Sequence, residues 1–339
     1  MKWPCVPISL MLIGLNSIVP APAFAASGFS SAICSREYTE AEANTIVRTV
    51  FEEKFQRLLK EKSKRLAASG ALSNSFVERN AGLKFIICDN PGGFDTLAVY
   101  GTGVAFDIQL VGLLMAQARA LIAGATINQK DQLALHRELM QAFITQGAKL
   151  NINPIQQVER EALATGMKAS EYKALLAVPK FKEREQTLFL VALYFLSLHE
   201  RCHFGLDHGS SIQKILKQPV SSQATANHKL ELEADKCAID ILNADEDGFA
   251  ASPISYFGLL MTVTTQMIVS AYAAAPETSS HPSSRTRLAE AQKRVLEFVS
   301  ANQSSATEKY KTTIQGVGAY MDNMLDFVDA KRTSRSKGH

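Results

Sequence analysis

The chain has 339 residues, of which 46% are hydrophobic and 20% are charged, and its formal net charge at pH 7 is +3. This length and composition are ordinary for a globular protein of one large domain or two small ones. A net charge this small, with Lys and Arg scattered along the chain, argues against nucleic acid as a main partner.

Residues 1–25 have the pattern of a secretory signal peptide. Lys2 precedes an apolar stretch at 6–19, and small residues flank Phe24 before a cleavage site after Ala25. We therefore expect an exported mature chain, periplasmic or secreted. The alternative is an uncleaved membrane anchor, although the apolar stretch is short for a membrane span.

The elements that follow are mostly helical. Apolar spacing predicts an amphipathic helix over 37–66, a strand over 83–88 and an extended segment over 95–108 that contains Gly101 and Gly103. Helical patterns follow near 110–123, 129–147, 154–165, 169–176, 181–205, 227–244, 253–274, 284–301 and 305–331, with a polar loop over 209–226. The expected fold class is α+β and predominantly helical.

The stretch 256–275 is long and apolar enough to be checked as a membrane span. Its threonines and its glutamine favour a buried core helix instead. No integral membrane span is therefore expected in the mature chain.

Four cysteines remain after the signal peptide: Cys34, Cys88, Cys202 and Cys237. In an oxidising compartment they could form two disulfides, with three possible connectivities. We prefer Cys34–Cys88 and Cys202–Cys237, because the second pair would join two helices that the metal site described next requires to be neighbours. The alternative is four buried free thiols.

The strongest motif is His-Glu-x-x-His at residues 199–203, in a segment of helical character over 183–204 that contains no Pro or Gly. Residues four apart share one helix face, so His199 and His203 can bind one zinc ion. Glu200 points to the side of these ligands and can act as a general base. A chance pair of core histidines is the alternative. The apolar residues before the motif predict a central, buried helix.

A catalytic zinc ion needs a third protein ligand and one open position. Glu231 and Asp235 are again four apart on a predicted helix. Glu231 can complete the site, and Asp235 can accept a hydrogen bond from the outer nitrogen of a ligand histidine. An ordinary acidic helix is the alternative for this segment. His208 has the wrong spacing for a third ligand, and we expect a loop histidine near the site mouth.

Three segments resemble the HtpX and CAAX prenyl endopeptidase family of zinc metallopeptidases. They are the motif at 199–203, Glu-x-x-Ala-Asp at 231–235 and His-Pro-x-x-x-x-Arg-Leu at 281–288. The resemblance implies a zincin-like core with a small edge sheet and a central zinc-binding helix. It implies that His281 stabilises the oxyanion and that Arg287 braces the site.

The same resemblance extends loosely to residues 95–103. It implies that Ala98, Gly101 and Gly103 lie on a strand that holds the substrate peptide. The implied domains are a metallopeptidase domain over 26–300 with a helical insertion at about 115–182, and a C-terminal helix with a basic tail over 301–339.

The predicted function is zinc-dependent endopeptidase activity on polypeptides in the cell envelope, with one zinc ion per chain and a role in protein quality control. The alternative is an envelope protein of another class, which contains zinc and holds peptides like a chaperone without cutting them. A closed, structural zinc site is a further alternative, and an extra ligand from Cys202 or His208 would be its sign.

Overall fold

The computed structural model describes residues 34–39, 61–89 apart from 62, 69 and 71, 96–99, 103–127, 136–138, 140, 168–244, 256–265 apart from 260 and 264, 282–301 and 307–336. The expected signal peptide at 1–25, the expected helix near 154–165 and most of the one near 129–147 lie outside these residues. The described part is mostly helical with one small sheet, which confirms the α+β, predominantly helical class.

The sheet has four strands in the order β1-β2-β4-β3. The strands are β1 (Arg36–Glu37), β2 (Lys84–Asp89), β3 (Thr96–Val99) and β4 (Gly103–Asp107). β4 runs parallel to β2, whereas β1 with β2 and β3 with β4 are antiparallel pairs. The extended segment expected over 95–108 is therefore two antiparallel strands.

The helix expected over 37–66 does not begin at its predicted residue. Glu37 lies in β1, where Ser35 N–H donates to Asp89 O at 2.9 Å and Tyr38 N–H donates to Ile87 O at 2.9 Å. Pairing with β2 thus replaces the helical start that the periodicity predicts. Residues 63–68 are helical, as predicted up to 66.

The helices of the described part of the chain include α3 (Asn74–Arg79), α4 (Ile108–Ile127), α7 (Ala169–Leu176), α8 (Pro179–Gly205), α9 (His208–Ile215), α10 (Val220–Asn243), α12 (Ser284–Ala301) and α13 (Thr307–Ser336). β4 leads directly into α4, where Asp107 Oδ1 accepts hydrogen bonds from the backbone N–H groups of Gln109 and Leu110. α4 runs unbroken through residue 115, so the predicted insertion would begin inside a helix.

The prediction of a polar loop over 209–226 is wrong, because α9 and the start of α10 occupy most of this segment. Ile212, Ile215 and Leu230 bury a small apolar cluster between these two helices. The polar residues that suggested a loop are largely the outer faces of helices. Pro219 marks only the short turn between them, at the N-cap position of α10.

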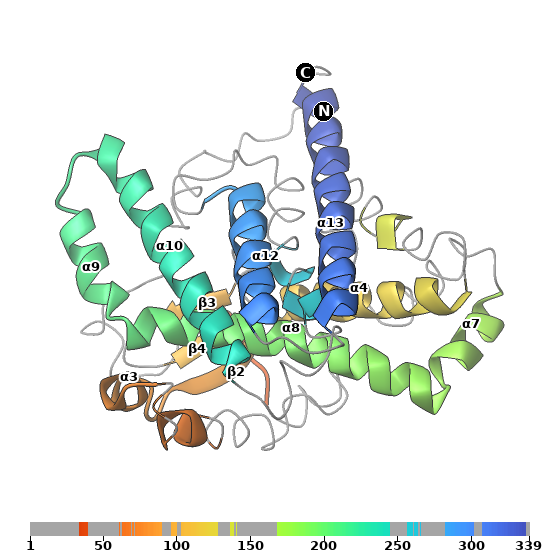
Figure 1. Cartoon of the computed structure of the whole chain (residues 1–339), viewed down its shortest axis with the longest axis horizontal. Coiled ribbons are helices and arrows are strands. Elements are labelled where there is room, and N and C mark those ends of the chain that lie inside the picture. Colours follow the sequence, from red (N-terminus) through yellow and green to blue (C-terminus); the bar gives the residue numbers. More distant parts are fainter. Residues whose placement is uncertain are drawn as a thin grey trace.

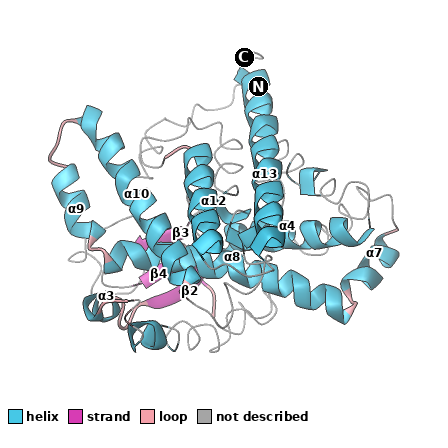
Figure 2. Cartoon of the chain, in the orientation of Figure 1, coloured by secondary structure: helices cyan, strands magenta, loops and turns pink. Residues whose placement is uncertain are grey.

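α8 runs across the middle of the molecule, and α10, α12 and α13 rise on one side of it (Figure 1). Figure 2 shows the strands gathered beside the half of α8 that leads to α9. α8 begins with Pro179 in its first turn, and nearly every residue from Leu188 to Gly205 is buried, against α4, α10 and the sheet. This helix is the rigid support of the site described next.

Among the described residues, no helix combines the length and the apolar character needed to cross a membrane.

Candidate metal centre

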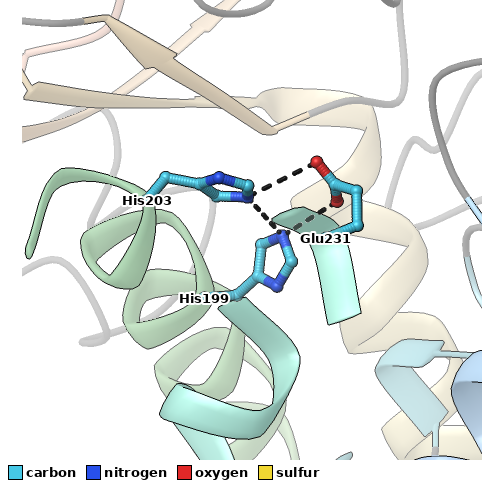
Figure 3. Close-up of side chains that lie close together, drawn as sticks. All are labelled: His199, His203 and Glu231. Atoms are coloured by element: carbon cyan, nitrogen blue, oxygen red, sulfur yellow. Dashed lines mark hydrogen bonds and ion pairs between the residues drawn. The ribbon is translucent and has the colours of Figure 1, made fainter. Parts of the chain in front are cut away.

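Three side chains of the metal-binding type converge where α8 meets α10. His199 and His203 come from the C-terminal part of α8, and Glu231 comes from α10 (Figure 3). One donor atom from each lies within 4.8 Å of the other two, and all three residues are buried. The helical spacing predicted the histidine pair, and the fold brings the carboxylate to it.

The donor atoms are close enough together for one metal ion to reach all three residues, and each oxygen of Glu231 lies near one of the two histidines. His199 Nε2 lies 3.2 Å from His203 Nε2 and 3.3 Å from Glu231 Oε2, and His203 Nε2 lies 3.5 Å from Glu231 Oε1. Metal–ligand bonds of about 2.0–2.1 Å at tetrahedral angles place neighbouring donor atoms about 3.3–3.4 Å apart. The donor set of two imidazoles and one carboxylate also leaves a fourth position open, as in catalytic zinc sites.

A buried ion pair supports His199 from behind. Asp235 Oδ1 accepts a hydrogen bond from His199 Nδ1–H at 2.9 Å. Arg287 Nε and Nη2 each donate to the same carboxylate at 2.6 Å. This double contact fixes the carboxylate, and the carboxylate in turn orients the imidazole with Nε2 toward the cluster.

The charges of this cluster shift its pKa values strongly. Burial lowers the pKa of His199, but the hydrogen bonds with Asp235 and Glu231 outweigh it and raise the pKa to about 10. Burial raises the pKa of Asp235, but Arg287 and His199 outweigh it and lower the pKa to about 2. Without a metal, His199 therefore carries a proton at neutral pH, and a bound cation would take that proton's place.

Glu200 is buried beside this cluster without belonging to the three donors. Burial lowers the pKa of Arg287, but Asp235, Glu231 and Glu200 together raise it above its ordinary value. The Glu200 carboxylate is thus close enough to the site for its charge to act there, while another residue supplies the third donor.

His208 was expected in a loop near the site mouth, and the structure places it elsewhere. It is the first residue of α9, it is buried, and its Nδ1 lies 2.9 Å from Nδ1 of His203. Its Nε2 lies 3.5 Å from Glu233 Oε2. His208 is not among the three clustered donors, and the spacing gave no sign of its contact with His203, which depends on the turn after α8.

A disulfide joins the two ligand-bearing helices. Cys202, next to His203, is bonded to Cys237, which lies two residues after Asp235 on α10. Cys34 and Cys88 form the second disulfide, between the β1 end and β2. These are the two pairs preferred from the sequence. The Cys202–Cys237 bond fixes the C-terminal part of α8 against α10 close to the metal cluster.

The far side of the motif helix is held by polar contacts that the sequence did not predict. Arg201 is buried, and its Nε–H donates to Asn80 Oδ1 at 3.3 Å. Arg79 Nη1 donates to the carbonyl of Gly205 at 2.8 Å, at the end of α8. A Cβ atom on Gly205 would lie 2.0 Å from the Phe76 ring, so this end of α8 packs closely against α3.

The structure places the predicted substrate-binding residues on different kinds of strand. Ala98 is buried on β3, which pairs with β4 alone among the described strands and lies against α8. Gly103 lies on β4, whose two edges are taken by β2 and β3, so it has no backbone edge left for a substrate. Its glycine is needed because a Cβ atom would lie 2.0 Å from Lys84 O, at a φ of 154°. Gly101 and His281 lie outside the described residues.

Comparison with known proteins gives one match. The profile of the Peptidase U49 family covers residues 126–306, which is more than half of the chain and includes the three donors, Asp235 and Arg287. No curated protein and no solved structure matches the chain.

Proposed function

The chain belongs to the Peptidase U49 family, and from this premise we propose that it is a zinc-dependent endopeptidase of the cell envelope. Membership of a peptidase family indicates a proteolytic function and a polypeptide substrate. The observation that carries the metal dependence is the convergence of His199, His203 and Glu231, close enough together for one metal ion to reach all three.

The proposed mechanism assigns a separate task to each residue. His199, His203 and Glu231 would hold the zinc ion, which when bound supplies a Lewis acid that polarises the scissile carbonyl and acidifies water. Glu200 takes the proton of the attacking water and delivers it to the leaving amine. Asp235 keeps the His199 ring in place throughout.

Two further roles in this proposal rest on the resemblance to the HtpX and CAAX prenyl endopeptidase family. His281 would stabilise the oxyanion. The edge strand β3, which includes Ala98, would hold the substrate by adding it as a further strand. The same resemblance underlies the proposed zincin-like core, the domain over 26–300 and the role in protein quality control.

Export is part of the proposal for two reasons. Residues 1–25 have the pattern of a signal peptide. The two disulfides are compatible with an oxidising compartment outside the cytoplasm.

The test is cleavage of unfolded casein by the mature chain, with zinc content measured on every sample. We expect cleavage by the wild type, loss of cleavage with a chelator, and loss in Glu200→Gln at unchanged zinc content. Glu231→Ala should lose zinc as well. Glu297→Gln is the matched control, because it makes the same change at a half-exposed side chain on α12.

Cleavage by Glu200→Gln at the wild-type rate would refute the assigned mechanism. Zinc bound at one per chain, with casein bound but not cut, would favour the chaperone-like alternative. A preparation that binds no zinc and still cleaves would show a peptidase of another catalytic type.

A further inference from the structure

The second ligand histidine has a support of its own, made by the turn that ends α8. Asp207 adopts a left-handed conformation with φ 58°, and this reverses the chain immediately after the helix. His208 is thereby folded back onto His203, with ring centroids 4.9 Å apart and ring planes at 74°. Ser210 Oγ donates to Asp207 Oδ1 at 2.9 Å and helps to fix the turn.

Only one arrangement of the protons on the two neutral rings keeps this contact and leaves Nε2 of His203 able to bind a metal. If Nε2 of His203 is to offer its lone pair to a metal, the proton must be on Nδ1. That Nδ1–H then donates to Nδ1 of His208, 2.9 Å away. His208 must in turn carry its own proton on Nε2, which faces the Glu233 carboxylate.

From this arrangement we infer that His208 is a positioning residue for the metal site. His208 holds His203 in the tautomer and orientation that present Nε2 to the metal, and Glu233 is the outer partner of His208. The inference rests on the proposed zinc site. It assigns His208 no contact with the metal or with the substrate.

The two ligand histidines are then supported in different ways. His199 is held by a buried carboxylate with two arginine contacts. His203 is held by the buried ring of His208, whose Nδ1 lies 2.9 Å from Nδ1 of His203. Beyond it, the side chain of Glu233 is 45% exposed and pairs with Lys229 at 3.8 Å. Only the support of His203 therefore reaches the protein surface.

The strengths of the two links in this support differ. The His203–His208 distance of 2.9 Å is that of a good hydrogen bond, and both rings are buried. The His208–Glu233 distance of 3.5 Å is too long for a good hydrogen bond, and water screens the half-exposed carboxylate. Loss of His208 should therefore matter more than loss of the Glu233 charge.

The experiment measures zinc affinity by competition with a chromophoric chelator, so it does not depend on turnover. His208→Asn places Oδ1 where the ring had Nδ1 and keeps an acceptor for His203. His208→Leu has nearly the same shape as Asn and removes that acceptor. His136→Asn is the matched control, because His136 is also fully buried and hydrogen-bonded but contacts Tyr320 and Gln117 instead of the metal cluster.

The outer link is tested in the same assay by Glu233→Gln. Its control is Asp240→Asn, on the same helix, with a similarly exposed carboxylate that pairs with Arg294. We expect His208→Leu to weaken zinc binding by about 10–100-fold, which is the usual cost of losing an outer partner of a ligand. His208→Asn should recover most of this loss, and Glu233→Gln should lose less than His208→Leu. Both controls should bind zinc like the wild type.

Wild-type zinc affinity in His208→Leu, or an equal loss in His136→Asn, would overturn the inference. So would a His208→Asn variant as weak as His208→Leu. Should the Leu variant not fold, long-range ¹H–¹⁵N spectra of the zinc-loaded wild type decide, since a proton on Nδ1 of His208 would overturn the assignment. A wild type that binds zinc without cleaving would refute the peptidase proposal alone, whereas one that binds no zinc would refute both.

Discussion

Replacement of Arg287 by Met should destabilise the metal-free protein strongly, whereas the same replacement of Arg285, two residues earlier on α12, should not. Arg287 is a buried guanidinium with two 2.6 Å contacts to Asp235. Arg285 makes contacts of 2.7 and 2.9 Å to two carboxylates at the surface, where its side chain is 41% exposed. The two arginines thus differ mainly in burial.

The magnitude follows from that difference. Removal of one partner of a buried ion pair typically costs about 3–5 kcal/mol, and the Asp235 carboxylate would keep only His199 as a buried partner. An exposed pair contributes about 0–1 kcal/mol. At about 2–4 °C per kcal/mol for a chain of 150–250 residues, Arg287→Met should lower Tm by about 6–20 °C, and somewhat less in this longer chain.

The assay is thermal unfolding followed by circular dichroism, in the presence of a chelator so that metal release does not contribute. The double variant Asp235→Leu with Arg287→Met should be more stable than Arg287→Met alone, since it also removes the buried carboxylate that has lost its arginine. Equal changes in Tm for Arg287→Met and Arg285→Met would refute the claim that burial makes the Asp235 pair important.

Three further outcomes are expected. Replacement of Cys202 and Cys237 by Ala should lower the free energy of unfolding by about 4 kcal/mol through loop entropy, and it should also weaken zinc binding in the competition assay. Removal of the other disulfide should lower the free energy of unfolding by a similar amount without weakening zinc binding. Zinc binding near pH 7 should release about one proton from His199, because its pKa is raised to about 10 in the metal-free protein. The stability that this raised pKa gives the metal-free protein is complete below about pH 6.5 and is lost as pH rises through 10. Calorimetry in buffers of different ionisation enthalpy measures the proton release, and a value of zero would contradict this prediction. Gly205→Ala should cost about 1–3 kcal/mol, since its Cβ would lie 2.0 Å from the Phe76 ring, and denaturant unfolding that matches the wild type would contradict this.

The helices of the core could be predicted because their apolar spacing is local information. α7 has the bounds predicted for it, and α8 and α12 are within two residues of theirs. The predicted loop over 209–226 failed because polar outer faces of two packed helices resemble a loop when the apolar partner, Leu230, lies further along the chain. β1 was missed because its two residues are held by pairing with β2, which is far away in sequence.

The candidate site shows the same division between local and distant information. Spacing alone placed His199 and His203 on one helix face. The contact of His208 with His203 could not be predicted, because it depends on the left-handed turn at Asp207, and residues other than Gly are uncommon in that conformation. The contact of Arg287 with Asp235 joins residues 52 apart, and the resemblance to a family indicated only that Arg287 braces the site.

The Cys202–Cys237 bond also has a consequence for the time and place at which the protein could act. A bond of this kind does not persist in a reducing cytosol. If the chain is exported as proposed, it would lack the cross-link between α8 and α10 before export, and with it part of the alignment of the three metal donors. The redox state of the compartment would then limit proteolysis by this chain before export.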